Sequence, residues 1–127
     1  MATAEQHTEE LLRSIESRAA LIGVVGIGYV GLPLSLAFVA AGFRVLGFDV
    51  NESKVAQLNA GEPYLQHLDP APLRSARARE QLVATSDFSR LKEADAILIC
   101  VPTPLTPQRE PDMLYIVQSA EAIRQCL

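Results

Sequence analysis

Three glycines in six positions, Gly26, Gly28 and Gly31, separate two apolar segments of this chain. Glycine destabilises the interior of a helix or strand because it loses more backbone freedom on folding than any other residue. The segment before the glycines, LIGVV, has the length of a strand, and apolar residues at helical spacing follow them in LPLSLAFVAA. The glycines therefore predict a tight turn between a strand and a helix.

The same alternation of strand and helix continues along the chain. Apolar runs predict strands, helical spacing predicts helices, and the proline-rich segments 62–72 and 102–111 predict loops. Strands are expected at residues 21–25, 43–50, 81–86 and 95–101, and helices at 8–18, 32–41, 51–61, 73–80, 88–94 and 112–127. Such alternation is typical of a parallel sheet joined by right-handed crossovers.

The glycines occupy the positions of a GxGxxG motif, "GIGYVG", over residues 26–31. The motif follows a predicted strand and opens a predicted helix, and Asp49 ends the next strand 18 positions after the last glycine, close to the expected spacing of about 20. This context predicts a dinucleotide-binding, Rossmann-type α/β fold. Glycines that serve only a turn are the alternative.

Each position of the motif has a physical role in such a fold. Gly26 permits the tight turn, Gly28 lets the backbone approach a pyrophosphate, and Gly31 allows the helix to pack closely on the strand. The N–H groups around Tyr29 and Val30, at the positive end of the helix, are expected to face the phosphates.

Asp49 indicates which dinucleotide is bound. A carboxylate at the end of the second strand accepts hydrogen bonds from the hydroxyls of the adenine ribose and repels a 2′-phosphate, which favours NAD over NADP. Lys54 weakens this preference if it turns toward the ribose; a surface lysine is the alternative.

Length and charge restrict the domain organisation and the partners. A chain of 127 residues suffices for one domain with a core, so we expect an amphipathic leading helix over residues 1–18, with Leu11, Leu12 and Ile15 on one face, and a single nucleotide-binding domain over 19–127. That domain would be a doubly wound sheet truncated after about four strands, where the full fold has six. The net charge of −4 and the lack of a basic stripe argue against nucleic-acid and membrane partners.

The isolated reactive residues have ordinary structural explanations. Cys100 and Cys126 show no metal-type spacing and no obvious pairing, which favours a reduced, cytoplasmic setting and no metal site. Arg74, Arg77 and Arg79 are interpreted as a solvated helix face, and His67 as a loop residue without a catalytic role.

Several motifs together resemble the N-terminal domain of the UDP-glucose/GDP-mannose dehydrogenase family. They are "GYVGLP", "DVNESKV", "LNAG" and "VPTPL", and the resemblance covers about residues 20–125. It implies oxidation of C6 of a nucleotide-linked sugar with NAD. The segments "VPTPLTPQREPD" and "YLQHL" look more like the branch that acts on UDP-N-acetylhexosamines, which implies a UDP-sugar substrate.

The resemblance also implies roles for single residues. Val30, Asp49 and Lys54 match the family's contacts to the pyrophosphate and the adenosine ribose, and Thr103 of "VPTP" matches a threonine that approaches the dinucleotide. The family's nucleophilic cysteine stands in a glycine-rich segment nearer the C-terminus, and neither cysteine of this chain matches it. We therefore expect no catalytic residue here.

Two classes of function remain open from the sequence. The chain is either the cofactor-binding part of a UDP-N-acetylhexosamine 6-dehydrogenase for polysaccharide synthesis, or a stand-alone binding module or inactive remnant. Another NAD enzyme, such as a hydroxyacyl dehydrogenase, would leave "VPTPLTPQREPD" unexplained. The apolar strand 95–101 is expected to be buried on both faces and to present an exposed edge, which predicts homo-oligomers.

Overall fold

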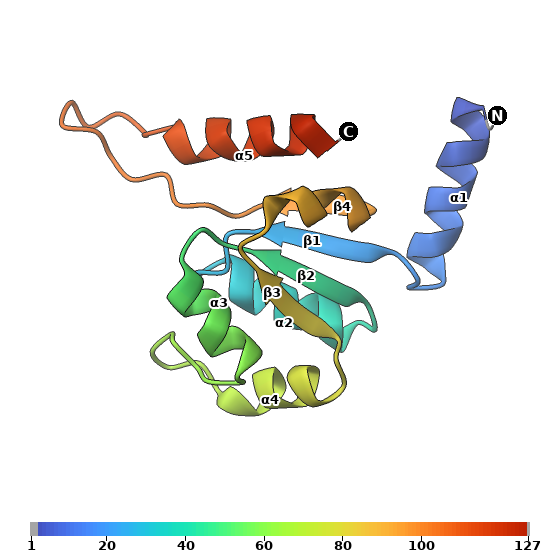
Figure 1. Ribbon diagram of the computed structural model, residues 1–127, viewed down its shortest axis with the longest axis horizontal. Coiled ribbons are helices and arrows are strands. Elements are labelled where there is room, and N and C mark those ends of the chain that lie inside the picture. Colours follow the sequence, from blue (N-terminus) through green and yellow to red (C-terminus); the bar gives the residue numbers. More distant parts are fainter. Residues whose placement is uncertain (1–2, 127) are drawn as a thin grey trace.

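Four parallel strands form one sheet in the order β3-β2-β1-β4 in the computed structural model, which describes residues 3–126 (Figure 1). The strands are β1 (Leu21–Val25), β2 (Arg44–Phe48), β3 (Leu82–Thr85) and β4 (Ala96–Ile99). The helices are α1 (Ala4–Glu16), α2 (Gly31–Ala40), α3 (Glu52–Asn59), α4 (Pro70–Ala78), the 3-10 helix η1 (Phe88–Glu93) and α5 (Leu114–Cys126). The predicted Rossmann-type α/β fold with a leading helix is confirmed.

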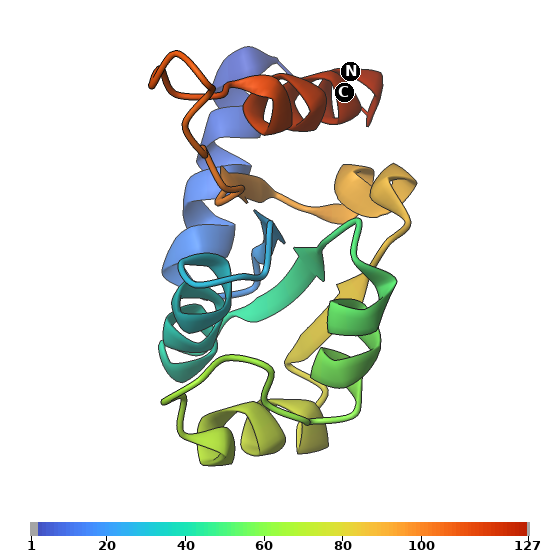
Figure 2. The ribbon, with the colours of Figure 1, turned by 90° about the vertical axis from the view of Figure 1, so that its left-hand side faces the viewer.

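Helices cover both faces of the sheet, as Figures 1 and 2 show. Side chains alternate between the faces along each strand, so that Ile22 and Val24 of β1 pack with α2, α3 and α4, whereas Val25 packs with η1 and α5. The sheet therefore separates two apolar cores. Helices α2, α3 and α4, which precede β3 in the chain, cover one face, and η1 and α5, which follow β3, cover the other.

The register of the strands brings three turns to one edge of the sheet. Val25, the last residue of β1, pairs with Phe48 of β2 and with Ile99 of β4. The glycine-rich turn, the residue after β2 and the loop after β4 consequently leave the sheet side by side. In open parallel sheets, ligands bind at this carboxyl edge, where the strand order reverses.

The leading helix α1 stands apart from the sheet (Figure 1). It begins at a capping box in which Thr3 and Gln6 exchange hydrogen bonds, and no residue of the helix is buried. The apolar residues that the sequence places on one face are 39% to 53% exposed; they are Leu11, Leu12 and Ile15.

Several sequence-based expectations are wrong in detail. Strand β4 is only partly buried, because β1 is its one strand neighbour in residues 3–126 and α5 packs against η1. Arg77 does not belong to a solvated face: its guanidinium donates to the carbonyls of Asn59 (2.9 Å) and Leu82 (2.7 Å) and ties α4 to α3 and β3. Arg74 and Arg79 are exposed as expected.

The proline-rich loop after α3 is also shorter than the sequence suggested. Helix α4 begins at Pro70 and not at residue 73, because Asp69 caps it and proline fits the first helical position, whose N–H has no partner within the helix. No helix in residues 3–126 is long and apolar enough to cross a membrane.

Candidate functional site

Two glycines of the turn are required by its geometry. Gly26 has a φ of 94°, its N–H donates to the Phe48 carbonyl (2.7 Å), and a Cβ there would lie 2.7 Å from the Cys100 carbonyl oxygen. A Cβ on Gly31 would lie 1.6 Å from the carbonyl oxygen of Gly26. The first turn of α2 therefore rests directly on the turn that leaves β1.

Gly28 has no such packing reason to be glycine. A Cβ there would meet only the Nζ atom of Lys54, at 3.9 Å, and its φ lies outside the left-handed region. Within residues 3–126, the N–H groups of Gly28, Tyr29 and Val30 donate no hydrogen bond. The turn thus presents an open backbone surface with free donors.

The start of α2 adds a positive potential to this surface. Tyr29 and Val30 are 82% and 62% exposed, and no side chain caps the helix at Val30. Free amides at a helix N-terminus, at the positive end of its dipole, favour an anion such as phosphate.

Asp49 lies immediately after β2 and reaches back to the turn. One carboxylate oxygen accepts from the Ile27 N–H (3.2 Å) and the other from the Asn51 N–H (2.9 Å). Asn51 in turn caps α3 by accepting from the N–H groups of Ser53 and Lys54. The carboxylate is therefore held in place and retains lone pairs for further donors, since an ionised carboxylate has about four acceptor sites.

Lys54 extends from the first turn of α3 toward the glycine-rich turn. It is half-buried, and its Nζ atom is the closest neighbour of the space beside Gly28. The structure thus places a cation next to the open amides, where an anionic group would be neutralised.

A cavity of about 510 Å³ adjoins these residues at the carboxyl edge of the sheet. Gly26, Asp49 and Lys54 line it, and its other walls come from η1, the β4 loop and α5: they include Phe88, Val101, Pro102, Tyr115, Ser119 and Ala122. Apolar walls with a few polar groups are typical of a small-molecule site.

Most of these wall residues were not identified from the sequence. Phe88 follows the carboxyl end of β3, a position that could have suggested it. Tyr115 and Ser119 belong to α5, whose approach to the sheet has no local sequence signal. Ser119 is buried, and its hydroxyl donates to the Tyr115 carbonyl (2.7 Å).

Gly26, Asp49 and Lys54 line the cavity, whereas the other residues of the turn, 28–31, are not among its lining residues. Thr103 does not line it either. It is exposed in the loop after β4, next to Pro102, which does line the cavity. Its role stays a prediction.

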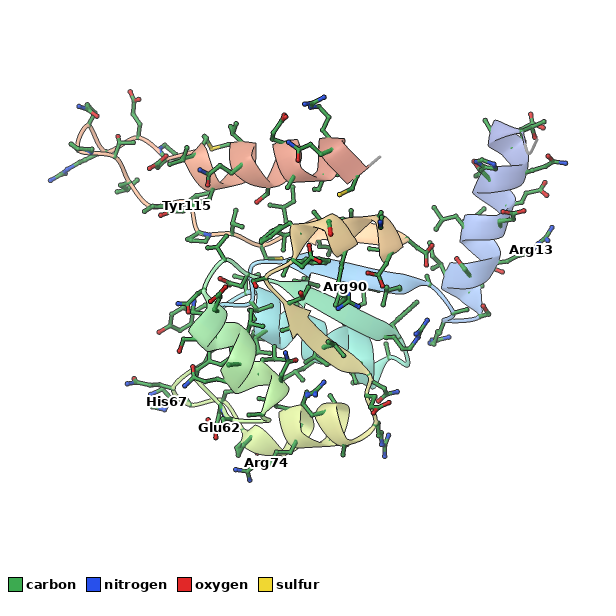
Figure 3. All side chains as sticks on the ribbon, viewed as in Figure 1. Arg13, Glu62, His67, Arg74, Arg90 and Tyr115 are labelled. Carbon is green, nitrogen blue, oxygen red and sulfur yellow. The ribbon has the colours of Figure 1, made fainter. Side chains whose placement is uncertain are left out.

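The reactive side chains lie outside this cavity. His67 is exposed on the loop between α3 and α4, on the other side of the sheet from Tyr115 (Figure 3). Burial raises the pKa of the Cys100 thiol, which keeps it protonated, and Cys126 contacts the carbonyl of Phe88. In the part of the chain that the structure describes, no three His, Cys, Asp or Glu side chains gather as metal ligands.

Comparison with known proteins agrees with this geometry. Residues 20–127 match the family model described as the NAD binding domain of the UDP-glucose/GDP-mannose dehydrogenase family. The chain is similar to UDP-N-acetyl-D-mannosamine dehydrogenase of Escherichia coli K12, with 37% identity over 108 residues. It is also similar to UDP-N-acetyl-D-glucosamine 6-dehydrogenase of Pseudomonas aeruginosa, with 34% identity over 106 residues.

These matches cover 85% and 84% of this chain but only 25% and 24% of the two relatives. The chain therefore spans about a quarter of their length. Among solved structures, GDP-mannose dehydrogenase from Pseudomonas aeruginosa superposes with a TM-score of 0.79 and 31% identity, over 83% of this chain and 24% of that one.

The glycine-rich turn, the carboxylate after β2 and the cavity beside them fit the cofactor that the matching domain binds. The chain belongs to the UDP-glucose/GDP-mannose dehydrogenase family, and residues 20–127 correspond to its NAD-binding domain.

Proposed function

We propose that this chain is the cofactor-binding part of an NAD-dependent 6-dehydrogenase that oxidises C6 of a UDP-N-acetylhexosamine to the uronic acid. The observation that carries the proposal is the open surface at Gly28, where three N–H groups have no hydrogen-bond partner within residues 3–126 and the Lys54 ammonium lies alongside. This surface has the charge and the space that a pyrophosphate requires.

Different residues of the site would bind different parts of the cofactor. The N–H groups of Tyr29 and Val30, together with Lys54, would bind the pyrophosphate. Asp49 would accept hydrogen bonds from the ribose hydroxyls, and the cavity beneath would hold the adenine. When bound, NAD supplies the hydride acceptor of the reaction.

The substrate class rests on the relatives and on sequence motifs. Two relatives, from Escherichia coli and Pseudomonas aeruginosa, are described as acting on UDP-N-acetyl-D-mannosamine and UDP-N-acetyl-D-glucosamine. The segment "VPTPLTPQREPD" after β4 supports the same branch. We also propose a role in polysaccharide synthesis, on the resemblance of the sequence to that branch.

Calorimetric titration with NAD and NADP tests the binding part of this proposal. We expect the chain to bind NAD more tightly than NADP, and Asp49→Ala to narrow the difference, because the carboxylate would no longer bind the ribose hydroxyls or repel a 2′-phosphate. Asp95→Ala is the matched control: the Asp95 carboxylate also accepts from a backbone N–H, that of Leu21 (2.8 Å), but at the opposite edge of the sheet. Equal affinity for both cofactors in the unmutated chain would contradict the proposal.

An assay of NADH formation distinguishes a chain that only binds the cofactor from a complete dehydrogenase. The second oxidation in such a reaction needs a thiolate that traps the aldehyde, and Cys100 and Cys126 both lie outside the cavity. We expect no NADH from the 127-residue chain with UDP-N-acetylglucosamine, UDP-N-acetylmannosamine or UDP-glucose. Steady NADH formation that Cys100→Ser or Cys126→Ser abolishes would show that the nucleophile has been misplaced.

A further inference from the structure

Tyr64 contacts the glycine-rich turn from a distant part of the chain. It lies on the loop between α3 and α4, packs against the core under α2, α3 and α4, and its hydroxyl donates to the Ile27 carbonyl (2.5 Å). No residue of that loop has been given a role in the site. The contact joins positions 37 residues apart, so it is not a consequence of local chain geometry.

Ile27 is consequently held on both sides. Its N–H donates to Asp49 and its carbonyl accepts from Tyr64, while its side chain is fully buried. A Cβ on Gly47 would lie 2.8 Å from Ile27 Cγ2, so the side chain is packed tightly on β2.

The orientation of the Ile27 carbonyl determines that of the next amide. The carbonyl of Ile27 and the N–H of Gly28 belong to one planar trans peptide group and point in opposite directions. Because the hydroxyl of Tyr64 holds the carbonyl, the N–H of Gly28 points away from Tyr64. Gly28 itself is free of packing constraints and would not maintain this orientation alone.

Tyr64 is suited to a permanent donor role. Burial, and secondarily the negative charge of Asp49, raise the pKa of its hydroxyl above the ordinary value, so the hydroxyl keeps its proton.

We infer that Tyr64 is a positioning residue for the phosphate-binding turn: its hydrogen bond to the Ile27 carbonyl orients the Gly28 amide toward the pyrophosphate of the dinucleotide. This inference rests on the proposed function. A loop that Tyr64 simply anchors to the core would need the same hydrogen bond but would not make phosphate binding depend on it.

The ligands adenosine, ADP-ribose and NAD separate these two roles. Tyr64→Phe deletes only the hydroxyl, and loss of one such hydrogen bond corresponds to about a threefold to tenfold loss of affinity. We expect this loss for NAD and ADP-ribose, which carry the pyrophosphate, and less than about a twofold change for adenosine, which does not. Arg77→Met is the control, because it removes two hydrogen bonds to carbonyls at the other edge of the sheet and should lower the melting temperature without changing these affinities.

The ligand-free chain gives an independent readout. Nuclear magnetic relaxation measurements should give lower order parameters for the Gly28 and Tyr29 amides in Tyr64→Phe than in the unmutated chain. Arg77→Met should leave these order parameters unchanged. If the unmutated chain binds no NAD, the proposed function fails and these relaxation measurements alone decide the inference. Unchanged order at Gly28, an equal loss of affinity for adenosine, or a Tyr64→Phe chain that does not fold would overturn it.

Discussion

Replacing Gly28 by alanine should separate the folding of this domain from its ability to bind phosphate. The added methyl group would have one neighbour within 4 Å, the flexible end of Lys54 at 3.9 Å, and the backbone φ of Gly28 lies outside the left-handed region. A glycine-to-alanine change in an accessible conformation stabilises a protein by about 0.4 to 1 kcal/mol, because the unfolded chain has less freedom to lose. The melting temperature of Gly28→Ala should therefore stay the same or rise.

NAD binding should change in the opposite direction. The methyl group would occupy the space through which a pyrophosphate approaches the free amides of Gly28 and Tyr29. Loss of one hydrogen bond to a charged group costs about 1.5 to 3 kcal/mol, which corresponds to roughly a tenfold to 150-fold weaker affinity. Adenosine, which lacks phosphate, should bind as it does to the unmutated chain.

Calorimetry and thermal denaturation of the same samples test this prediction. Gly31→Ala is the contrasting variant, because its Cβ would lie 1.6 Å from the Gly26 carbonyl oxygen and would push α2 off the turn. It should lose about 1 to 3 kcal/mol or more of stability, as overpacked sites do. A Gly28→Ala chain that binds NAD as tightly as the unmutated chain, or that unfolds at a clearly lower temperature, would refute the reasoning.

Two further predictions concern pH and association. Burial and the charge of Asp49 raise the pKa of Tyr64 above 10.0, so the unfolded chain loses this proton before the folded chain does as pH rises. The contribution of Tyr64 to the free energy of unfolding should therefore be constant below pH 10.0 and decrease above it. Denaturant titrations of Tyr64→Phe should lack this part of the pH dependence. The side of β4 that pairs with no strand in residues 3–126, with Ile99 40% exposed, should promote self-association, and a clean monomer in sedimentation at high concentration would count against this.

The glycine motif and the strand pattern sufficed to predict the order of elements and the position of the turn. The spacing from Gly31 to Asp49 reflects one crossover from β1 through α2 to β2, so a local sequence pattern could place the carboxylate beside the turn. The caps of α3 and η1 use residue types that commonly cap helices: Asn51 and Asp87 accept hydrogen bonds from the N–H groups two residues ahead of them.

Contacts between distant segments could not be predicted in this way. The walls that α5 contributes to the cavity depend on how the helix packs on η1, and Tyr64 reaches Ile27 across 37 positions. The burial of β4 was overestimated, because an apolar run indicates that a strand is buried but does not indicate which elements bury it. Arg77 was misjudged for a related reason, since a long side chain at a helix end can turn inward to bond carbonyls.

Titration of the isotope-labelled chain with NAD, followed by amide chemical shifts, tests the central claim most directly. We expect the shifts to concentrate at the carboxyl edge of the sheet, and the amides of α1 and of His67 itself not to respond. The responding amides should be those of residues 26–31, Asp49, Lys54, Phe88, Tyr115 and Ser119. Saturable shifts at α1 or at His67 with none at residues 26–31, or no shifts at any NAD concentration, would contradict the claim.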